Sequence, residues 1–356
     1  MSKKSKSDIS AEALKALNTI DKMNNLAGFL DQSTLSNVTE WHDTGCLVLN
    51  SIISGSLYKG VPQGRVTGFA GPSMAGKTYI INKILAGAQR DGLIPVIFDT
   101  EAAVDEGSVR GVGLDPGKVK YVPVQTVEET RNQIVKFLDS IIEAKQQGKF
   151  IISIDSLGNL ASQKEINDIE AGKTAVDMGT RAKGLKSMMR TLTFKAAEAN
   201  TTILFSNHTY DDPAAMFPSL VKNQSGGKGP VYLASVLVQL AKKDERHDKN
   251  NESDQMITEA KTYSGTTLRA LTVKNRFVPP FLEAEIYLNF KTGLDKYSGL
   301  LNIAVNHGAI IQTGSTYQLP DGTKLGYYKS WRDNEEVWEK VLPIIEEKLN
   351  LEYQYN

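Results

Sequence analysis

Hydrophobic residues fall in short, dense runs from about Thr44 onward, and stretches of mixed polarity separate these runs. Four runs have the length of a buried strand, at residues 65–70, 95–99, 150–155 and 201–207. Three stretches between or after them have the pattern of helices, at residues 79–86, 127–147 and 180–200. Near-continuous apolar strands that alternate with helices are typical of a parallel sheet covered on both faces. The pattern therefore predicts an α/β fold with a mostly parallel central sheet.

The pattern changes towards the end of the chain. Three further strand-like runs, at residues 235–240, 268–273 and 284–290, stand closer together and have short or polar connections. This spacing predicts an antiparallel extension of the sheet. Residues 242–264 are polar and charged, which predicts an exposed loop. A last helix is expected from about Asn334, and Pro343 is expected to kink or divide it.

A short amphipathic segment precedes the alternating region. Ser10 is a suitable N-cap for a helix over residues 11–23, and Leu14, Leu17 and Ile20 share one side of that helix. Two interpretations stay open: a surface helix folded back on the core, or an arm that packs on a neighbouring subunit. The expected organisation is an N-terminal arm over residues 1–43, a core over 44–300 and a small C-terminal element over 301–356.

Composition limits the class of protein. The chain has 356 residues with 41 basic and 41 acidic side chains, so any basic surface must be local. Its one cysteine, Cys46, excludes an intramolecular disulfide and suits a reducing compartment. No apolar segment of a signal peptide follows the basic N-terminus, and no run is long enough to cross a bilayer. We therefore expect a soluble cytoplasmic protein without a membrane partner.

One motif carries specific chemistry. The phosphate-binding P-loop pattern G-x-x-x-x-G-K-[ST] is filled by Gly71, Pro72, Ser73, Met74, Ala75, Gly76, Lys77 and Thr78. A strand-like run precedes this motif and a helix-like stretch follows it from Tyr79, which is the context that a P-loop requires. Backbone N–H groups and the helix N-terminus would bind phosphate, Lys77 would reach the β- and γ-phosphates, and Thr78 would ligate Mg²⁺. The chain is therefore expected to bind a nucleoside triphosphate through these eight residues and Tyr79.

Two carboxylates are candidates to complete the site. Asp155 ends an apolar run, which is the form of a Walker B residue that holds Mg²⁺ directly or through water. Glu101 follows the run that ends in Asp99, at the carboxyl edge of the sheet where α/β folds bind ligands. There it would orient or deprotonate a water molecule. A solvated loop carboxylate is the alternative interpretation of Glu101.

Several segments resemble the RecA-type recombinase core and follow its order along the chain. The matching segments are residues 44–51, 64–78, 98–101 and 154–157. More specific segments resemble the UvsX recombinases of tailed bacteriophages, namely residues 155–162, 206–210 and 295–301. The resemblance covers about residues 44–305. It implies a RecA-like P-loop ATPase fold, with ATP and Mg²⁺ as cofactors.

The resemblance also implies two loops that bind single-stranded DNA, within about residues 164–178 and 210–229. The candidate residues for contact with the DNA backbone are Arg181, Lys183, Lys222, Gly226, Gly227 and Lys228. A flexible glycine segment would let backbone amides approach a phosphate. A solvated helix face is the alternative interpretation of the basic residues that follow the first loop.

Three more residues take their expected roles from the resemblance. His208 stands where RecA relatives carry a polar residue that senses the γ-phosphate and connects it to the second DNA loop. A buried histidine with satisfied hydrogen bonds is the alternative. Lys274 and Arg276 match paired basic residues that reach the ATP of the neighbouring subunit, in a role like that of an arginine finger.

Two regions depart from the family pattern. RecA relatives stack the adenine on a tyrosine shortly after the catalytic glutamate, and Ser108 stands at the matching position. Asp105 and Phe290 are candidates to hold the base instead. The C-terminal segment is shorter than the C-terminal domain of bacterial RecA, and we expect Trp331 and Trp338 to pack a small terminal element.

The resemblance implies ATP-dependent homologous strand exchange. A helical filament on single-stranded DNA would pair that strand with homologous double-stranded DNA, assisted by single-strand-binding and mediator proteins, in the host cytoplasm if the chain is phage-encoded. A hexameric helicase would need a collar domain, for which the residues ahead of Thr44 are too few. Two further functions stay open: a regulatory paralogue that does not exchange strands, and an ATPase unrelated to DNA.

Overall fold

The computed structural model describes residues 9–33, 35–173, 179–210, 220–227, 229–247 and 263–353, and the chain divides into two compact units after Thr39. The first unit contains helix α1 (Ala11–Met23) and a 3-10 turn, η1 (Leu30–Gln32). The Ser10 hydroxyl accepts a hydrogen bond from the Ala13 N–H at 3.3 Å, which confirms the expected N-cap and helix. Its role as a surface helix or an intersubunit arm stays a prediction.

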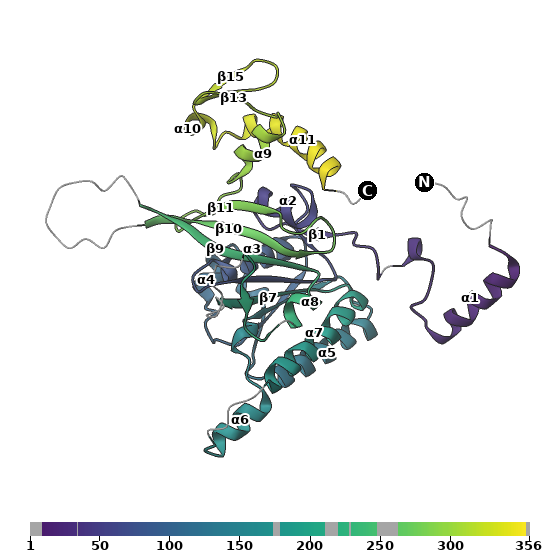
Figure 1. Cartoon of the computed structure of the whole chain (residues 1–356). Helices are drawn as coiled ribbons and strands as arrows, with labels where there is room; N and C mark the ends of the chain where they lie inside the picture. Colours follow the sequence, from purple (N-terminus) through teal and green to yellow (C-terminus); the bar gives the residue numbers. More distant parts are fainter. Residues whose placement is uncertain are drawn as a thin grey trace. The chain divides into compact units, whose positions relative to one another are not determined.

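The second unit is built on one large sheet, whose strands lie in the order β12-β11-β10-β9-β3-β7-β6-β4-β5. Figure 1 shows β11, β10 and β9 as neighbours in this sheet. The parallel strands are β3 (Val66–Gly71), β4 (Ile94–Asp99), β5 (Lys120–Pro123), β6 (Phe150–Asp155), β7 (Thr202–Tyr210) and β9 (Val236–His247). The antiparallel ones are β8 (Asn223–Gln224), β10 (Tyr263–Asn275), β11 (Glu283–Asn289) and β12 (Gly293–Leu294). The expected α/β fold with a mostly parallel sheet is confirmed.

Two expectations about the later strands were wrong in part. β9 pairs parallel with β3 and antiparallel with β10, so the antiparallel extension begins one strand later than predicted. The expected loop over residues 242–264 is shorter, because β9 runs to His247 and β10 starts at Tyr263. Charged side chains can stand on this part of β9 because they pair with charges on other strands of the sheet, as the ion pair between Lys243 of β9 and Glu285 of β11 illustrates. Residues 248–262 lie outside the described residues.

Helices and short turns connect these strands. The helices are α2 (Leu47–Ser54), α3 (Lys77–Arg90), α4 (Glu106–Gly111), α5 (Val127–Glu143), α6 (Gln163–Glu170), α7 (Thr180–Glu198) and α8 (Gly229–Leu233). The 3-10 turns are η2 (Pro116–Lys118) and η3 (Leu157–Asn159), and a two-stranded sheet joins β1 (Trp41–His42) to β2 (Val61–Pro62). The helices predicted after the P-loop, before β6 and before β7 are confirmed to within a few residues.

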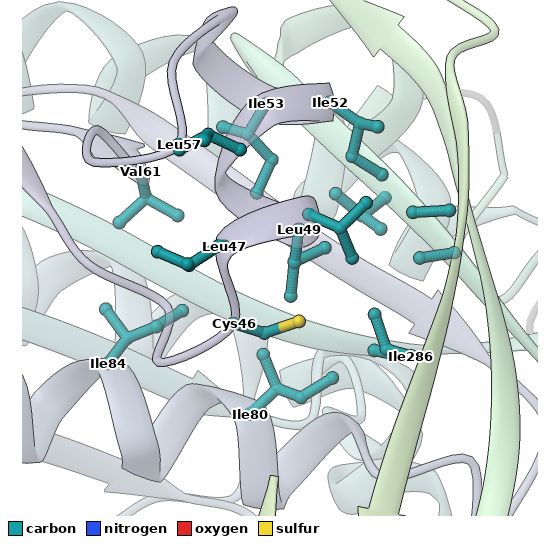
Figure 2. Close-up of a cluster of buried hydrophobic side chains, with 14 of the residues drawn as sticks. Cys46, Leu47, Leu49, Ile52, Ile53, Leu57, Val61, Ile80, Ile84 and Ile286 are labelled. Carbon is teal, nitrogen blue, oxygen red and sulfur yellow. The ribbon is translucent and has the colours of Figure 1, made fainter. Parts of the chain in front are cut away.

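Both faces of the sheet are covered by apolar side chains. One buried cluster contains residues of α2 and α3, and Figure 2 shows Leu49, Ile80 and Ile286 around the buried Cys46. A second cluster contains residues of α5 and α7. Successive strand residues enter different clusters, as Leu204 and Phe205 do, because side chains alternate across a strand. This two-sided burial explains why the central strands are almost continuously apolar.

The C-terminal segment forms a small element that packs on the first cluster. Its parts are α9 (Leu300–Asn306), β13 (Ile311–Thr313), β14 (Thr316–Gln318), β15 (Lys324–Gly326), α10 (Tyr328–Trp331) and α11 (Glu335–Glu352). Trp331 and Trp338 are buried, with ring centroids 5.5 Å apart, so their expected packing role is confirmed. The Glu346 carboxylate accepts hydrogen bonds from the Ser56 hydroxyl and the Leu57 N–H, at 2.5 and 2.7 Å. Pro343 lies inside α11 without dividing it, contrary to one of the two expected effects.

Burial of His42 predicts that the protein loses stability in mild acid. The side chain is 3 % exposed, and its Nε2 lies 3.1 Å from the Thr202 hydroxyl. Burial lowers the pKa of His42 from 6.5 to about 4, although Asp91 opposes this shift. The unfolded chain therefore takes up a proton before the folded chain does, so stability falls as the pH drops from about 6.5 towards 4.

We expect this group to remove roughly 3 kcal/mol over that interval. Urea unfolding of wild type and His42→Gln at several pH values measures how steeply the free energy of unfolding of each protein changes with pH. The variant Arg131→Gln, which changes an α5 side chain that stays charged over this pH range, is the control and should keep the wild-type pH dependence. If the free energy of unfolding changes equally with pH in wild type and His42→Gln, the prediction is contradicted.

Candidate nucleotide-binding site

The P-loop has the geometry of a phosphate cradle. β3 ends at Gly71 and α3 begins at Lys77, so the loop leads directly into a helix N-terminus. Gly76 has a φ of 74°, a conformation that favours glycine. A Cβ atom on Gly71 would lie 2.6 Å from the Leu240 carbonyl oxygen, so a side chain there would displace β9. Both glycines of the motif are therefore required by the backbone.

Lys77 is held inside this loop. Its Nζ donates hydrogen bonds to the carbonyl oxygens of Gly71 and Pro72, at 3.1 and 2.7 Å. Burial lowers the pKa of Lys77, while the carboxylates of Asp155 and Glu101 oppose the shift. A cation that already lies on loop carbonyls, next to a helix N-terminus, is well placed to meet phosphate oxygens.

Oxygen ligands gather beside the loop. The Thr78 hydroxyl donates to Asp155 Oδ2 at 2.6 Å, and the Ser206 hydroxyl donates to Oδ1. Among the described residues, no group of three or more His, Cys, Asp or Glu side chains could hold a metal ion. A hydroxyl and a single carboxylate are nevertheless the kind of set that binds Mg²⁺ together with substrate phosphates. The donor set therefore fits a nucleotide-bound Mg²⁺.

Glu101 is fixed from two sides. The buried Asp99 carboxylate accepts hydrogen bonds from the N–H groups of Glu101 and Ala103, at 2.8 and 3.1 Å, which sets the turn after β4. Glu101 Oε1 accepts from the Ser156 hydroxyl at 3.1 Å and from Asn159 Nδ2 at 2.7 Å. Both partners lie just after β6, the strand that also carries Asp155. The arrangement aims a carboxylate over the edge of the sheet, as an activating base requires.

His208 joins this group from β7. Its Nε2 lies 3.7 Å from Glu101 Oε1, and its side chain is 39 % exposed, so the alternative of a buried histidine is wrong. The His208 carbonyl accepts a hydrogen bond from the Ser225 N–H at 3.0 Å. The ring is therefore near Glu101, while the backbone is tied to the glycine segment at Gly226 and Gly227.

Lys274 and Arg276 lie far from the P-loop of their own chain. Lys274 lies near the end of β10 and Arg276 directly follows this strand, whose last residue, Asn275, pairs with Val236 at the start of β9. β9 runs parallel to β3, so this end of β10 lies at the amino edge of the sheet and the P-loop at the carboxyl edge. The length of β3 alone separates the edges by roughly 17 Å. Burial, and after it the positive charge of Arg276, lowers the pKa of Lys274 to about 8.

The remaining candidates for nucleotide binding have different surroundings. Asp105 caps α4, and its side chain accepts a hydrogen bond from the Ser108 N–H at 3.0 Å. The Phe290 side chain is exposed. Tyr79 is half-buried, and a Cβ atom on Gly293 would collide with its hydroxyl. Their contact with a nucleotide stays a prediction.

The candidates for DNA binding also differ from one another. Lys183 is exposed on α7, and Lys222 is half-buried next to β8. Gly226 and Gly227 have φ angles of 84° and 76°, conformations that favour glycine. Arg181 lies against backbone carbonyls, at 2.6 Å from the Leu160 oxygen. Lys228 and residues 174–178 and 211–219 lie outside the described residues.

Comparison with known proteins identifies the family. The model of the RecA N-terminal domain matches residues 12–295. The chain belongs to the RecA family. The recombination and repair protein of Enterobacteria phage T4 is 28% identical over 334 residues, which cover 92% of this chain and 79% of the relative. Protein RecA of Paenarthrobacter aurescens is 28% identical over 297 residues, which cover 82% of this chain and 79% of the relative.

These findings confirm the resemblance to RecA recombinases and to their phage branch. RecA-family proteins are DNA-dependent ATPases of recombination and repair that form filaments, so the expected class of enzyme is confirmed. In the described part of the chain, no helix is both long and apolar enough for a membrane span.

Several residues of this RecA-family site were not predicted. Ser156 and Asn159 hold Glu101, Ser206 binds Asp155, and Asp99 sets the turn that carries Glu101. Asp99, Ser156 and Asn159 lie at or just after the carboxyl ends of central strands, and Ser206 lies in the middle of β7. For the first three, that position was the available signal, because ligands of open α/β sheets bind at this edge.

Proposed function

We propose that this protein is an ATP-dependent recombinase that forms a helical filament on single-stranded DNA and pairs that strand with a homologous duplex. One observation carries the proposal: the P-loop constellation and the Lys274–Arg276 pair occupy opposite edges of the same sheet. A chain with half of a site at each end completes the site only by head-to-tail contact with further copies. Such heterologous contacts that do not close generate helical filaments.

The residues at the carboxyl edge support ATP and Mg²⁺ as cofactors. Backbone N–H groups of the loop and Lys77 would hold the phosphates, and Thr78 and Asp155 would hold Mg²⁺, which supplies positive charge to the transferring phosphoryl group. Glu101 would take the proton of the attacking water. Ser156 and Asn159 keep one carboxylate oxygen occupied, so the other is left to accept that proton.

His208 would couple this chemistry to DNA. Its ring lies near Glu101, and its backbone is hydrogen-bonded to Ser225, which precedes Gly226 and Gly227. We place the DNA-binding loops within residues 164–178 and 210–229, on either side of α7 and β7. The core over residues 44–300, the arm over 1–43, the element over 301–356, and a cytoplasmic place of action with single-strand-binding and mediator proteins belong to the same proposal.

A joint-molecule assay tests this function. Purified protein, labelled single-stranded DNA, ATP and Mg²⁺ are mixed with homologous or heterologous duplex DNA, and the paired product is measured. We expect product only with the homologous duplex, and none from a Lys77→Ala variant, which lacks the phosphate-binding cation. Pairing that ignores homology would refute the assignment. Closed rings in place of filaments in electron micrographs would favour a hexameric helicase.

A further inference from the structure

The side chain of Arg181 makes hydrogen bonds to backbone carbonyl groups of its own chain, which its position in the sequence did not predict. Arg181 is the second residue of α7, directly after the first proposed DNA loop. Its Nε donates to the Leu160 carbonyl at 2.6 Å, and its Nη2 donates to the Gly158 carbonyl and, at 3.4 Å, to the Leu157 carbonyl. Nη2 also lies 3.3 Å from the Ser225 hydroxyl. One guanidinium therefore joins three chain segments.

The first of these segments positions the catalytic base. Asn159 lies between the two carbonyl groups that Arg181 binds most closely, and its side chain holds Glu101 at 2.7 Å. Gly158 also faces His208, since a Cβ atom on Gly158 would lie 3.0 Å from His208 Cδ2. A shift of these carbonyl groups would therefore move a hydrogen-bond donor to Glu101 and a neighbour of His208.

The second segment belongs to the other proposed DNA loop. Ser225 is followed by Gly226 and Gly227, which lie against the first turns of α7. A Cβ atom on Gly226 would collide with Leu185, and one on Gly227 would lie 3.8 Å from the Ala182 Cβ. The end of this loop and the N-terminus of α7 are therefore packed together, with Arg181 at their junction.

We propose that Arg181 is a positioning residue that transmits the state of both DNA loops to Glu101. This inference rests on the proposed function and names a regulatory contact within it. The planar guanidinium presents several donors in a fixed fork, so a change in either loop alters the same set of bonds that fixes the Asn159 backbone. Lysine carries the charge and lacks the fork.

This role differs in its consequences from a contact with DNA phosphate. A phosphate contact affects how tightly DNA binds, and its loss lowers the salt dependence of binding by about one unit of slope. A positioning contact affects the rate that saturating DNA induces. The two roles are therefore separated by measuring the maximal ATPase rate and the DNA requirement independently.

The test compares Arg181→Lys, Arg181→Ala and wild type in ATP hydrolysis over a range of single-stranded oligonucleotide concentrations. We expect both variants to lose about tenfold or more of the maximal DNA-stimulated rate, while the DNA concentration for half-stimulation changes less than about threefold. Thermal melting checks that each variant folds. If Arg181→Ala does not fold, the comparison of Arg181→Lys with wild type carries the test. Arg131→Ala removes an arginine of α5 whose guanidinium donates to the side chain of its neighbour Asn132, and should match wild type.

A second variant examines the link to the loop. Ser225→Ala removes one partner of the guanidinium, so we expect a partial loss that does not add to the loss in Arg181→Ala. Wild-type maximal rates in Arg181→Lys and Arg181→Ala, with a raised DNA requirement, would overturn the inference and leave the proposed function intact. A wild-type protein without DNA-stimulated hydrolysis would overturn both.

Discussion

Replacement of Glu101 by glutamine should lower the DNA-stimulated rate of ATP hydrolysis by about 10³-fold, because a general base contributes on this order. The amide oxygen of glutamine can still accept the hydrogen bonds from Ser156 and Asn159, so the loop should keep its shape. We therefore expect the variant to bind nucleotide and single-stranded DNA within about threefold of wild type. Phosphate release and fluorescence anisotropy of labelled DNA measure the two properties.

The matched control for this result is Glu106→Gln. Glu106 lies on α4, where its side chain is exposed and pairs with Arg110 at 2.7 Å. This variant should hydrolyse ATP at the wild-type rate. If Glu101→Gln hydrolyses ATP within tenfold of wild type, another group activates the water.

Two inactive variants should restore activity when mixed, provided that Lys274 and Arg276 act on the neighbour's nucleotide. Glu101→Gln inactivates the P-loop side of an interface, and the double variant Lys274→Ala/Arg276→Ala inactivates the opposite side. In a random equimolar filament, about a quarter of the head-to-tail interfaces combine the intact side of each variant. We expect about that fraction of the wild-type hydrolysis rate on saturating single-stranded DNA.

The control mixture combines Glu101→Gln with Lys77→Ala. Both changes lie on the P-loop side, so no interface has an intact P-loop side. The mixture should therefore stay inactive. Failure of the first mixture to recover, although both variants bind DNA together, would mean that the basic pair does not act across the interface.

The central sheet and the P-loop could be predicted because their signals are local. β4, β6 and β7 are buried on both faces, which leaves a dense apolar run in the sequence. The glycines and Lys77 occur at a fixed spacing that one loop geometry requires. Burial and backbone conformation therefore leave marks on the sequence within a few residues.

The direction in which two strands pair and the direction in which a side chain points leave no such local signal in the sequence. The run in β9 looks the same whether its neighbour is parallel or antiparallel, so its pairing with β3 was not predicted. Arg181 and Lys183 are both basic residues at the start of one helix, yet Arg181 donates to backbone carbonyl groups at η3 while Lys183 is exposed. Three-dimensional contacts between segments decide such cases, and the sequence reflects them only indirectly.

The P-loop and the Lys274–Arg276 pair lie at opposite edges of one sheet, which has a consequence for how activity depends on the amount of protein. If Lys274 and Arg276 act on the neighbour's nucleotide, an isolated molecule holds the base without the partner cations, and its own hydrolysis would be slow at any nucleotide concentration. Turnover per molecule would then depend on how many neighbours each copy has, and would rise steeply with the amount of protein until assembly is complete. A cell containing a few copies would have a nearly silent enzyme, and the threshold for activity would be set by expression as much as by substrate.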